Sequence, residues 1–171
     1  MLAEMARAGI EDFVIWDNSQ TTDFAVYGRY RAVELAANET CYSQDDDVIV
    51  PSATIRALLA AHEPGRITAN MPAQFLPHYP DSCLLGFGAV FDADLPRQAF
   101  ERYARHAPRT KGDILKRPDV VFAALTPYQT VTLPVESLPY AYGPDRMYRQ
   151  ENHHQERLRV LQRCRRIRRR R

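Results

Sequence analysis

Helical and strand-like segments alternate along the first 65 residues, and this alternation limits the fold more than any other feature of the sequence. Apolar side chains recur at helical spacing in three segments, and short runs typical of strands separate them. The helices are expected at residues 1–9, 27–38 and 51–65, and the strands at residues 12–16 and 40–44. This order predicts an α/β fold with helices packed around a mostly parallel sheet, and ligands of such folds bind beyond the carboxyl ends of the strands.

The same kind of pattern continues through the rest of the chain. Strands are expected at residues 66–73, 83–92 and 129–135, and helices at residues 95–107 and 147–166. Residues 118–125 mix the two characters. Gly86 and Gly88 lie within the strand-like sequence GFGAVF, and glycines inside a strand indicate a close backbone approach.

Three consecutive carboxylates, Asp45, Asp46 and Asp47, follow the second expected strand. Adjacent like charges destabilise a compact state unless a cation lies among them. Oxygen ligands select hard ions such as Mg²⁺, Mn²⁺ or Ca²⁺, which are commonly held by one or two carboxylates together with substrate phosphates. The alternative is an acidic loop ahead of the helix that begins near Pro51, because a helix dipole favours carboxylates at that end. Both interpretations stay open at this point.

Length and composition favour one globular domain. The chain has 171 residues, of which 45% are apolar and 26% charged, and this length fits a single domain. Cys41, Cys83 and Cys164 are odd in number and widely spaced, which argues against a disulfide framework or a structural zinc site. The sequence has no apolar run of about 18 residues and no charged-then-apolar leader, so we expect a cytoplasmic protein without a membrane span.

Positive charge is concentrated near the C-terminus. Residues 157–171 contain nine of the 23 Lys and Arg residues and no acidic residue, which leaves 14 basic and 21 acidic residues, a net charge of −7, in the remainder. We therefore divide the chain into a domain at residues 1–150 and a basic helix or tail at residues 151–171. Such blocks often bind DNA or another polyanion, although a solvated helix end is the alternative. The candidate polyanion-binding residues are Arg163, Arg165, Arg166, Arg168, Arg169, Arg170 and Arg171.

Four motifs, in this order, are similar to motifs of the GT-A glycosyltransferases, in their family 2-like and exostosin-like branches. They are FVIWDNS, QDDDVIVP, LLGFGAVF and KRPDVVFAAL, and the resemblance extends from about Met1 to about Val135. The resemblance implies a GT-A (Rossmann-like) α/β/α sandwich with a mostly parallel mixed sheet. It also implies a glycosyltransferase that depends on Mn²⁺ or Mg²⁺ and moves a sugar from a nucleotide-sugar donor to an acceptor hydroxyl. A modified base of DNA is an acceptor that would also account for the basic C-terminus.

The resemblance assigns a role to each matching residue. Asp119 would deprotonate the acceptor hydroxyl in an inverting enzyme, or stabilise a positively charged sugar centre in a retaining one. Nucleotide-sugar binding is expected of Asp17, Asn18, Arg29, Arg31, Asp45 and Asp46, metal binding of Asp47, Asp45 and His154, and the acceptor side of Gly86 and Gly88.

Local sequence offers structural alternatives for some of these residues. Arg31 fits a solvated helix face, His154 fits an exposed surface position, and Asp119 fits a helix N-cap after Pro118. A typical GT-A domain also opens with a strand, whereas this sequence starts within the helix that follows it. A truncated start, another strand in that place, or a degenerate relative without turnover would each explain the difference. The competing function is a non-catalytic module that binds a nucleotide or a polyanion.

Overall fold

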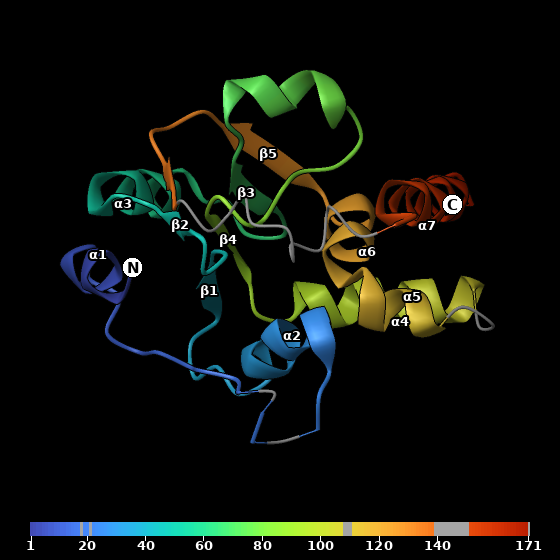
Figure 1. The fold of residues 1–171 in the computed structure, drawn as a ribbon, viewed down its shortest axis with the longest axis horizontal. Helices are drawn as coiled ribbons and strands as arrows, with labels where there is room; N and C mark the ends of the chain where they lie inside the picture. The colour runs from blue at the N-terminus through green and yellow to red at the C-terminus, as the bar shows by residue number, and fades with distance from the viewer. Residues whose placement is uncertain (18, 21, 108–110, 139–150, 171) are drawn as a thin grey trace.

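The computed structural model describes the chain except for residues 18, 21, 108–110, 139–150 and 171, and it has an α/β fold (Figure 1). A four-stranded sheet and a two-stranded sheet lie in the middle, with helices on either side. The helices α1 and α3 lie beside the N-terminus, and α4, α6 and α7 gather on the opposite side with the C-terminus. These helices span Leu2–Arg7, Ser52–Ala61, Leu95–His106, Pro118–Leu125 and His153–Arg168 respectively.

Three strands of the larger sheet run in one direction and the fourth runs against them. The strands are β1 (Thr40–Ser43), β4 (Ala89–Asp92), β3 (Ile67–Asn70) and β5 (Tyr128–Val131), in that spatial order. Strand β4 is antiparallel to both of its neighbours, whereas β3 and β5 are parallel. The carboxyl ends of β1, β3 and β5 therefore lie at the same edge of the sheet.

The expected mostly parallel, Rossmann-like sheet is wrong, because most pairings are antiparallel. Parallel neighbours need a crossover connection, usually an α-helix. The connection between β3 and β4 contains only the 3₁₀ segment η2 (Ala73–His78), which includes Pro77, so β4 begins at the edge where β3 ends and runs back beside it. The predicted α/β class is confirmed.

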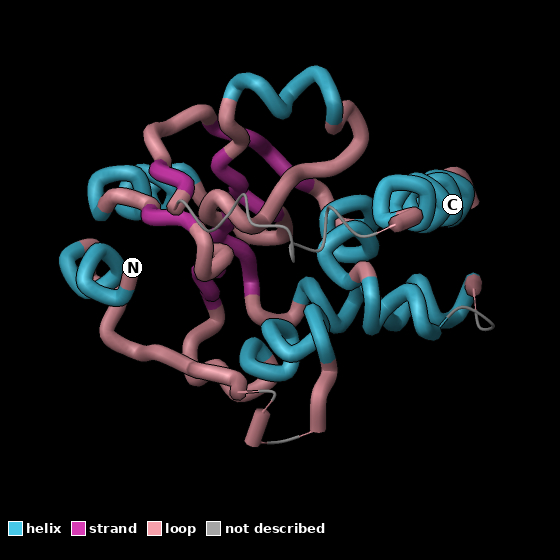
Figure 2. The backbone as a smooth tube through the Cα atoms, viewed as in Figure 1, coloured by secondary structure: helices cyan, strands magenta, loops and turns pink. Residues whose placement is uncertain are grey.

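The strand expected at residues 12–16 is also wrong. These residues belong to neither sheet and lie on a loop between α1 and η1 (Ala25–Tyr27) (Figure 2). The side chains of Phe13, Val14 and Ile15 are exposed, and Ile15 reaches 77%. An apolar run becomes a strand only where a neighbouring strand completes its backbone hydrogen bonds, and local composition does not show whether that neighbour exists.

Most other expected elements are confirmed. All four strands of the larger sheet fall within or close to their predicted segments, and so do the helices α1, α3, α4 and α7. Residues 118–125, which mixed both characters, form α6, and the expected helix at 27–38 is the shorter α2 (Gly28–Val33). The sequence did not predict α5 (Lys111–Lys116) or the small sheet of β2 (Val48–Ile49) and β6 (Glu136–Ser137). The first residues of the last predicted helix, 147–150, lie outside the described residues.

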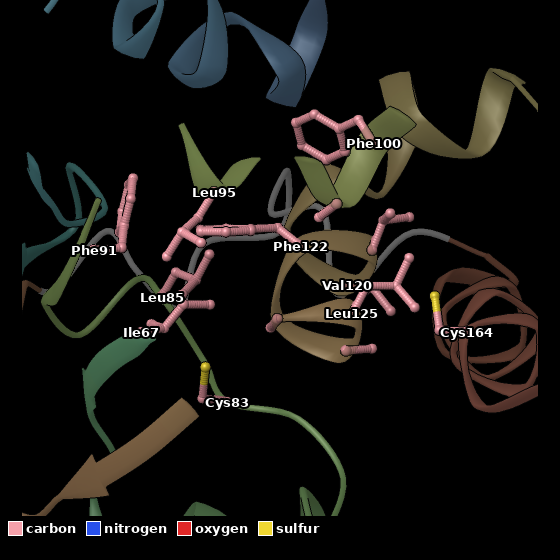
Figure 3. Packing of buried hydrophobic residues seen from close by; sticks show 14 of the residues in the cluster. Ile67, Cys83, Leu85, Phe91, Leu95, Phe100, Val120, Phe122, Leu125 and Cys164 are labelled. Atoms are coloured by element: carbon pink, nitrogen blue, oxygen red, sulfur yellow. The ribbon is translucent and has the colours of Figure 1, made fainter. Parts of the chain in front are cut away.

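The basic C-terminal helix shares the core of the domain. Val160, Cys164 and Ile167 of α7 are at most 4% exposed and belong to the same apolar cluster as Phe91 and Phe122. Figure 3 shows Cys164 directed at Val120 and Leu125 of α6. Burial of an apolar side chain of this size stabilises a fold by about 1.5–3 kcal/mol, so α7 is a structural element of the domain.

In the part of the chain that the structure describes, no helix has the length and apolar character needed to cross a bilayer.

Candidate functional site

A cluster of charged side chains lies just past the end of β1. Arg29 of α2 donates a hydrogen bond from Nη2 to Oδ1 of Asp45, and its Nη1 lies 3.8 Å from Oδ2 of Asp119 on α6. The structure thus brings together three predicted site residues that are far apart in the sequence. Two carboxylates that share one guanidinium leave one net negative charge at the cluster.

Arg29 is the centre of this cluster. Its side chain is 21% exposed, and burial by itself would lower the pKa of the guanidinium. The adjacent carboxylates of Asp119 and Asp45 more than offset burial and raise the pKa of Arg29. Arg29 therefore stays charged and holds the two carboxylates near one another.

Tyr30 orients Asp119, and sequence reasoning missed it. Its hydroxyl donates to Oδ1 of Asp119 at 2.6 Å, and the residue is 2% exposed. Its ring meets the rings of Phe100 and Phe122 edge to face, at centroid distances of 5.0 and 5.7 Å. Burial, and then the charge of Asp119, raise the pKa of Tyr30 well above its ordinary value, so the hydroxyl remains a donor. In the sequence, only the position of Tyr30 next to Arg29 pointed to a role at the site.

Asp119 does not cap α6. The N-cap position belongs to Arg117, and no side chain caps the helix there. Asp119 lies in the first turn, 32% exposed, with Tyr30 and Arg29 as its partners. The capping alternative for Asp119 is therefore wrong.

The close backbone approach predicted from the two glycines is confirmed. The amide of Asp45 donates to the carbonyl of Gly86 at 2.9 Å, and a Cβ at Gly86 would overlap the Asp45 carboxylate. Gly88 has φ +102°, a conformation that side chains disfavour, and a Cβ there would lie 3.1 Å from Oη of Tyr42. Glycine at position 86 lets the β4 side of the sheet reach the charged cluster.

Asp46 and Asp47 form the turn between β1 and β2, so the three carboxylates lie at a strand end as predicted. Asp46 is exposed, and the Asp47 carbonyl accepts from the amide of Leu138 at 2.8 Å. Among the described residues, no three His, Cys, Asp or Glu side chains are grouped as a metal-binding set. The oxygen donors of this acidic turn, Asp45–Asp47, suit a hard divalent ion whose other ligands are phosphate oxygens and water.

Arg31 lies elsewhere. Residues two positions apart on a helix point to different sides, and the guanidinium of Arg31 lies 5.9 Å from the Trp16 ring and 5.7 Å from the Phe24 ring. It also pairs with Glu34. These contacts fit a structural role for Arg31 better than diphosphate binding.

The remaining predicted ligands are not brought to the cluster by any contact described. Asp17 accepts from the amide and hydroxyl of Ser19, and these bonds lower the pKa of its carboxyl. Asn18 lies outside the described residues. His154 is exposed in the first turn of α7.

A cleft of about 410 Å³ lies near the acidic turn, and no residue of the turn itself lines it. Phe87 in its wall follows Gly86, which touches Asp45, and Ser137 precedes Leu138, which binds Asp47. The cleft lies where the chain leaves β3 and β5, at the carboxyl-end edge of the sheet. Its lining residues are Pro72, Ala73, Gln74, Phe75, Phe87, Thr132, Leu133, Pro134, Val135 and Ser137.

The arginines of α7 divide into two groups. Arg163 and Arg159 pair with the buried Asp113, Arg165 pairs with Asp81, and Arg157 lies over the Tyr79 ring. Those four stabilise the packing of α7. Arg171 lies outside the described residues. Arg166, Arg168, Arg169 and Arg170 are exposed and make none of these contacts.

No protein-family model, curated protein or solved structure matches this chain.

Proposed function

We propose that the protein is a metal-dependent glycosyltransferase that moves a sugar from a nucleotide-sugar donor to an acceptor hydroxyl. The observation that carries the proposal is that Arg29 links Asp45, in the acidic turn, to Asp119 on α6. The motifs QDDDVIVP and KRPDVVFAAL are similar to motifs of GT-A enzymes, in which they lie beside the donor diphosphate and the reacting sugar. In such an enzyme the two motifs must lie side by side, because the diphosphate and the sugar belong to one donor molecule.

The position of the cluster in the fold also supports the proposal. It follows β1, at the edge where the carboxyl ends of β1, β3 and β5 lie. Ligands of parallel α/β sheets commonly bind beyond the carboxyl ends of the strands, and β3 and β5 form a parallel pair here. The cleft of about 410 Å³ near the turn has the size of a small-molecule site.

Each residue of the cluster has a distinct part in the proposed reaction. Asp47 and Asp45 would hold Mn²⁺ or Mg²⁺, which when bound neutralises the charge of the diphosphate leaving group. Asp119 accepts the proton of the acceptor hydroxyl if the anomeric centre inverts, or stabilises positive charge on the sugar if it is retained. Arg29 and Tyr30 are positioning residues, because they fix the two carboxylates relative to one another.

A screen of nucleotide sugars for Mn²⁺-dependent hydrolysis tests the proposal, followed by kinetics of Asp119→Asn. The substitution keeps the shape of the side chain and removes a charge needed mainly in the transition state, so kcat should fall by about 10²–10⁴ while KM changes little. Asp94→Asn, at the N-cap of α4, is the matched control and should retain normal kinetics. Normal turnover per folded molecule of Asp119→Asn would reject the role of Asp119.

A second candidate is the non-catalytic module that binds a nucleotide or polyanion. It is favoured by the exposed arginines at the end of α7, which pair with no acidic residue in the contacts described. This candidate predicts nucleotide or DNA binding without hydrolysis of any nucleotide sugar in the same screen.

A further inference from the structure

We propose that the cleft binds an unpaired base of a single-stranded nucleic acid, whose backbone runs from the cleft toward α7. The inference begins from a row of flat side chains, Phe87, Phe75, Tyr79 and Arg157, called here the aromatic row. It starts in the cleft wall and ends on the basic helix.

Successive members of the aromatic row are in contact. Phe87 and Phe75 stack with their ring planes 23° apart and their centroids at 5.2 Å, and Phe75 meets Tyr79 edge-on at 6.5 Å. The Arg157 guanidinium lies 4.8 Å from the centre of the Tyr79 ring. All four side chains are only partly buried, so ring surface remains accessible to a ligand. The row therefore offers several stacking positions in sequence.

The lining of the cleft suits a neutral, flat ring with polar edges. None of the described residues that line it is charged, and the two phenylalanines provide apolar surface. Gln74, Thr132 and Ser137 supply hydrogen-bonding groups around them. A phosphate would gain nothing from this lining, whereas a nucleobase could use both its face and its edge.

Positive charge continues beyond the aromatic row along one flank of α7. Arg157, Arg165 and Arg168 are spaced by eight and three residues, which places them on the same side of a helix. Arg165 pairs with Asp81 in the loop after η2, the green helical segment at the top of Figure 1, whereas Arg168 is exposed. A stacking platform beside a cationic track is the combination by which proteins bind single strands without sequence preference.

The inference rests on the proposed function in one respect: if the protein transfers a sugar, the single-stranded nucleic acid would be its acceptor. Binding of a strand needs no sugar transfer, so the two can fail separately. A protein that hydrolyses nucleotide sugars but ignores single strands would overturn this inference alone.

The test measures binding of a fluorescein-labelled ten-nucleotide oligothymidine by anisotropy, for the full chain and for Phe75→Leu and Phe87→Leu. Leucine keeps the apolar packing and removes the ring, so each variant should bind about tenfold more weakly. Phe24→Leu, a partly buried phenylalanine outside the cleft, is the matched control and should bind as the unaltered chain does. Thermal unfolding verifies that all variants are folded.

Salt dependence separates stacking from electrostatics in the same experiment. The phenylalanine variants should keep the slope of log K against log salt, whereas Arg168→Gln should reduce it by about 0.7, the value of one phosphate contact in a single strand. Affinities of Phe75→Leu and Phe87→Leu within twofold of the control would overturn the proposal. The proposal would also be overturned if the two phenylalanine variants bound oligothymidine normally but lost affinity for a nucleoside diphosphate with Mn²⁺. The cleft would then bind the donor.

Discussion

Two buried tyrosines bind a carboxylate in the same way, and the proposed site gives them different roles. Tyr30 donates to Asp119 and Tyr103 donates to Asp113, each at 2.6 Å and each at most 2% exposed. Loss of either hydroxyl should destabilise the fold by about 1.5–3 kcal/mol, the value of a hydrogen bond to a charged group. Only Tyr30→Phe should also lower kcat, because only Asp119 belongs to the proposed site.

The comparison of Tyr30→Phe with Tyr103→Phe checks this prediction by urea unfolding and by turnover per folded molecule. Equal turnover in the two variants would mean that Tyr30 only stabilises the fold.

Because of two buried thiols, the unfolding free energy of the protein should fall as the pH rises in the alkaline range. Cys83 and Cys164 are at most 2% exposed, and burial raises the pKa of each thiol from 9.0 to about 12. Their pKa is higher in the folded state, so the stabilisation is fully present below about pH 9 and is lost as the pH rises toward 12. The urea midpoint should therefore fall between pH 8 and pH 10.5. A Cys83→Ala, Cys164→Ala variant should show a smaller fall, and an identical fall would contradict the assignment to the thiols.

At the scale of elements, the basic helix has two separable properties. Deletion of residues 157–171 should unfold the protein, because it removes the buried Cys164 together with Val160 and Ile167, the last two worth about 1.5–3 kcal/mol each. The contribution of the arginine charges to DNA binding is therefore tested by substitution, which leaves the buried side chains of α7 in place. Replacing Arg166, Arg169 and Arg170 by glutamine should leave the fold intact and weaken binding to duplex DNA, with the salt slope reduced by about 0.9 for each phosphate that the variant no longer neutralises.

The matched control for this variant carries glutamine at Arg7, Arg66 and Arg97, which are 62%, 40% and 61% exposed and lie outside α7. It removes the same charge elsewhere on the surface. Anisotropy at two salt concentrations compares the two variants. Equal weakening in both would show that net charge, and no particular surface on α7, determines binding.

Elements were predictable where local pattern decides, and unpredictable where a distant partner decides. Helix α4 has its apolar spacing and a proline in the first turn in its own sequence, and β4 has its apolar run. Residues 12–16 have the same kind of run and form no strand, because a strand depends on its neighbour. The direction of β4 likewise depends on the short 3₁₀ connection before it.

At the scale of the whole molecule, sequence patterns identified several chemical groups of the cluster but could not give its geometry. The three carboxylates after β1, the glycines of GFG and Asp119 were recognised from local motifs, and Arg29 from its place between the strands expected at residues 12–16 and 40–44. Their convergence requires α2, β1 and α6 to pack together. The role of Tyr30 depends on a contact over 89 residues, and the aromatic row depends on the path of the loop after β3. No local pattern contains either.

The most direct test of the central claim, that the acidic turn binds a metal ion together with a nucleotide, is calorimetry with a nucleoside diphosphate in the presence and absence of Mn²⁺. The unaltered chain and Asp94→Ala should bind only with Mn²⁺, and at 100 times Kd the ligand should raise the unfolding free energy by about 2.7 kcal/mol. Asp47→Ala should remain folded, because its backbone bond with Leu138 is kept, and should lose Mn²⁺-dependent binding. Binding by Asp47→Ala with unchanged affinity, or no binding by the unaltered chain with Mn²⁺, would contradict the claim.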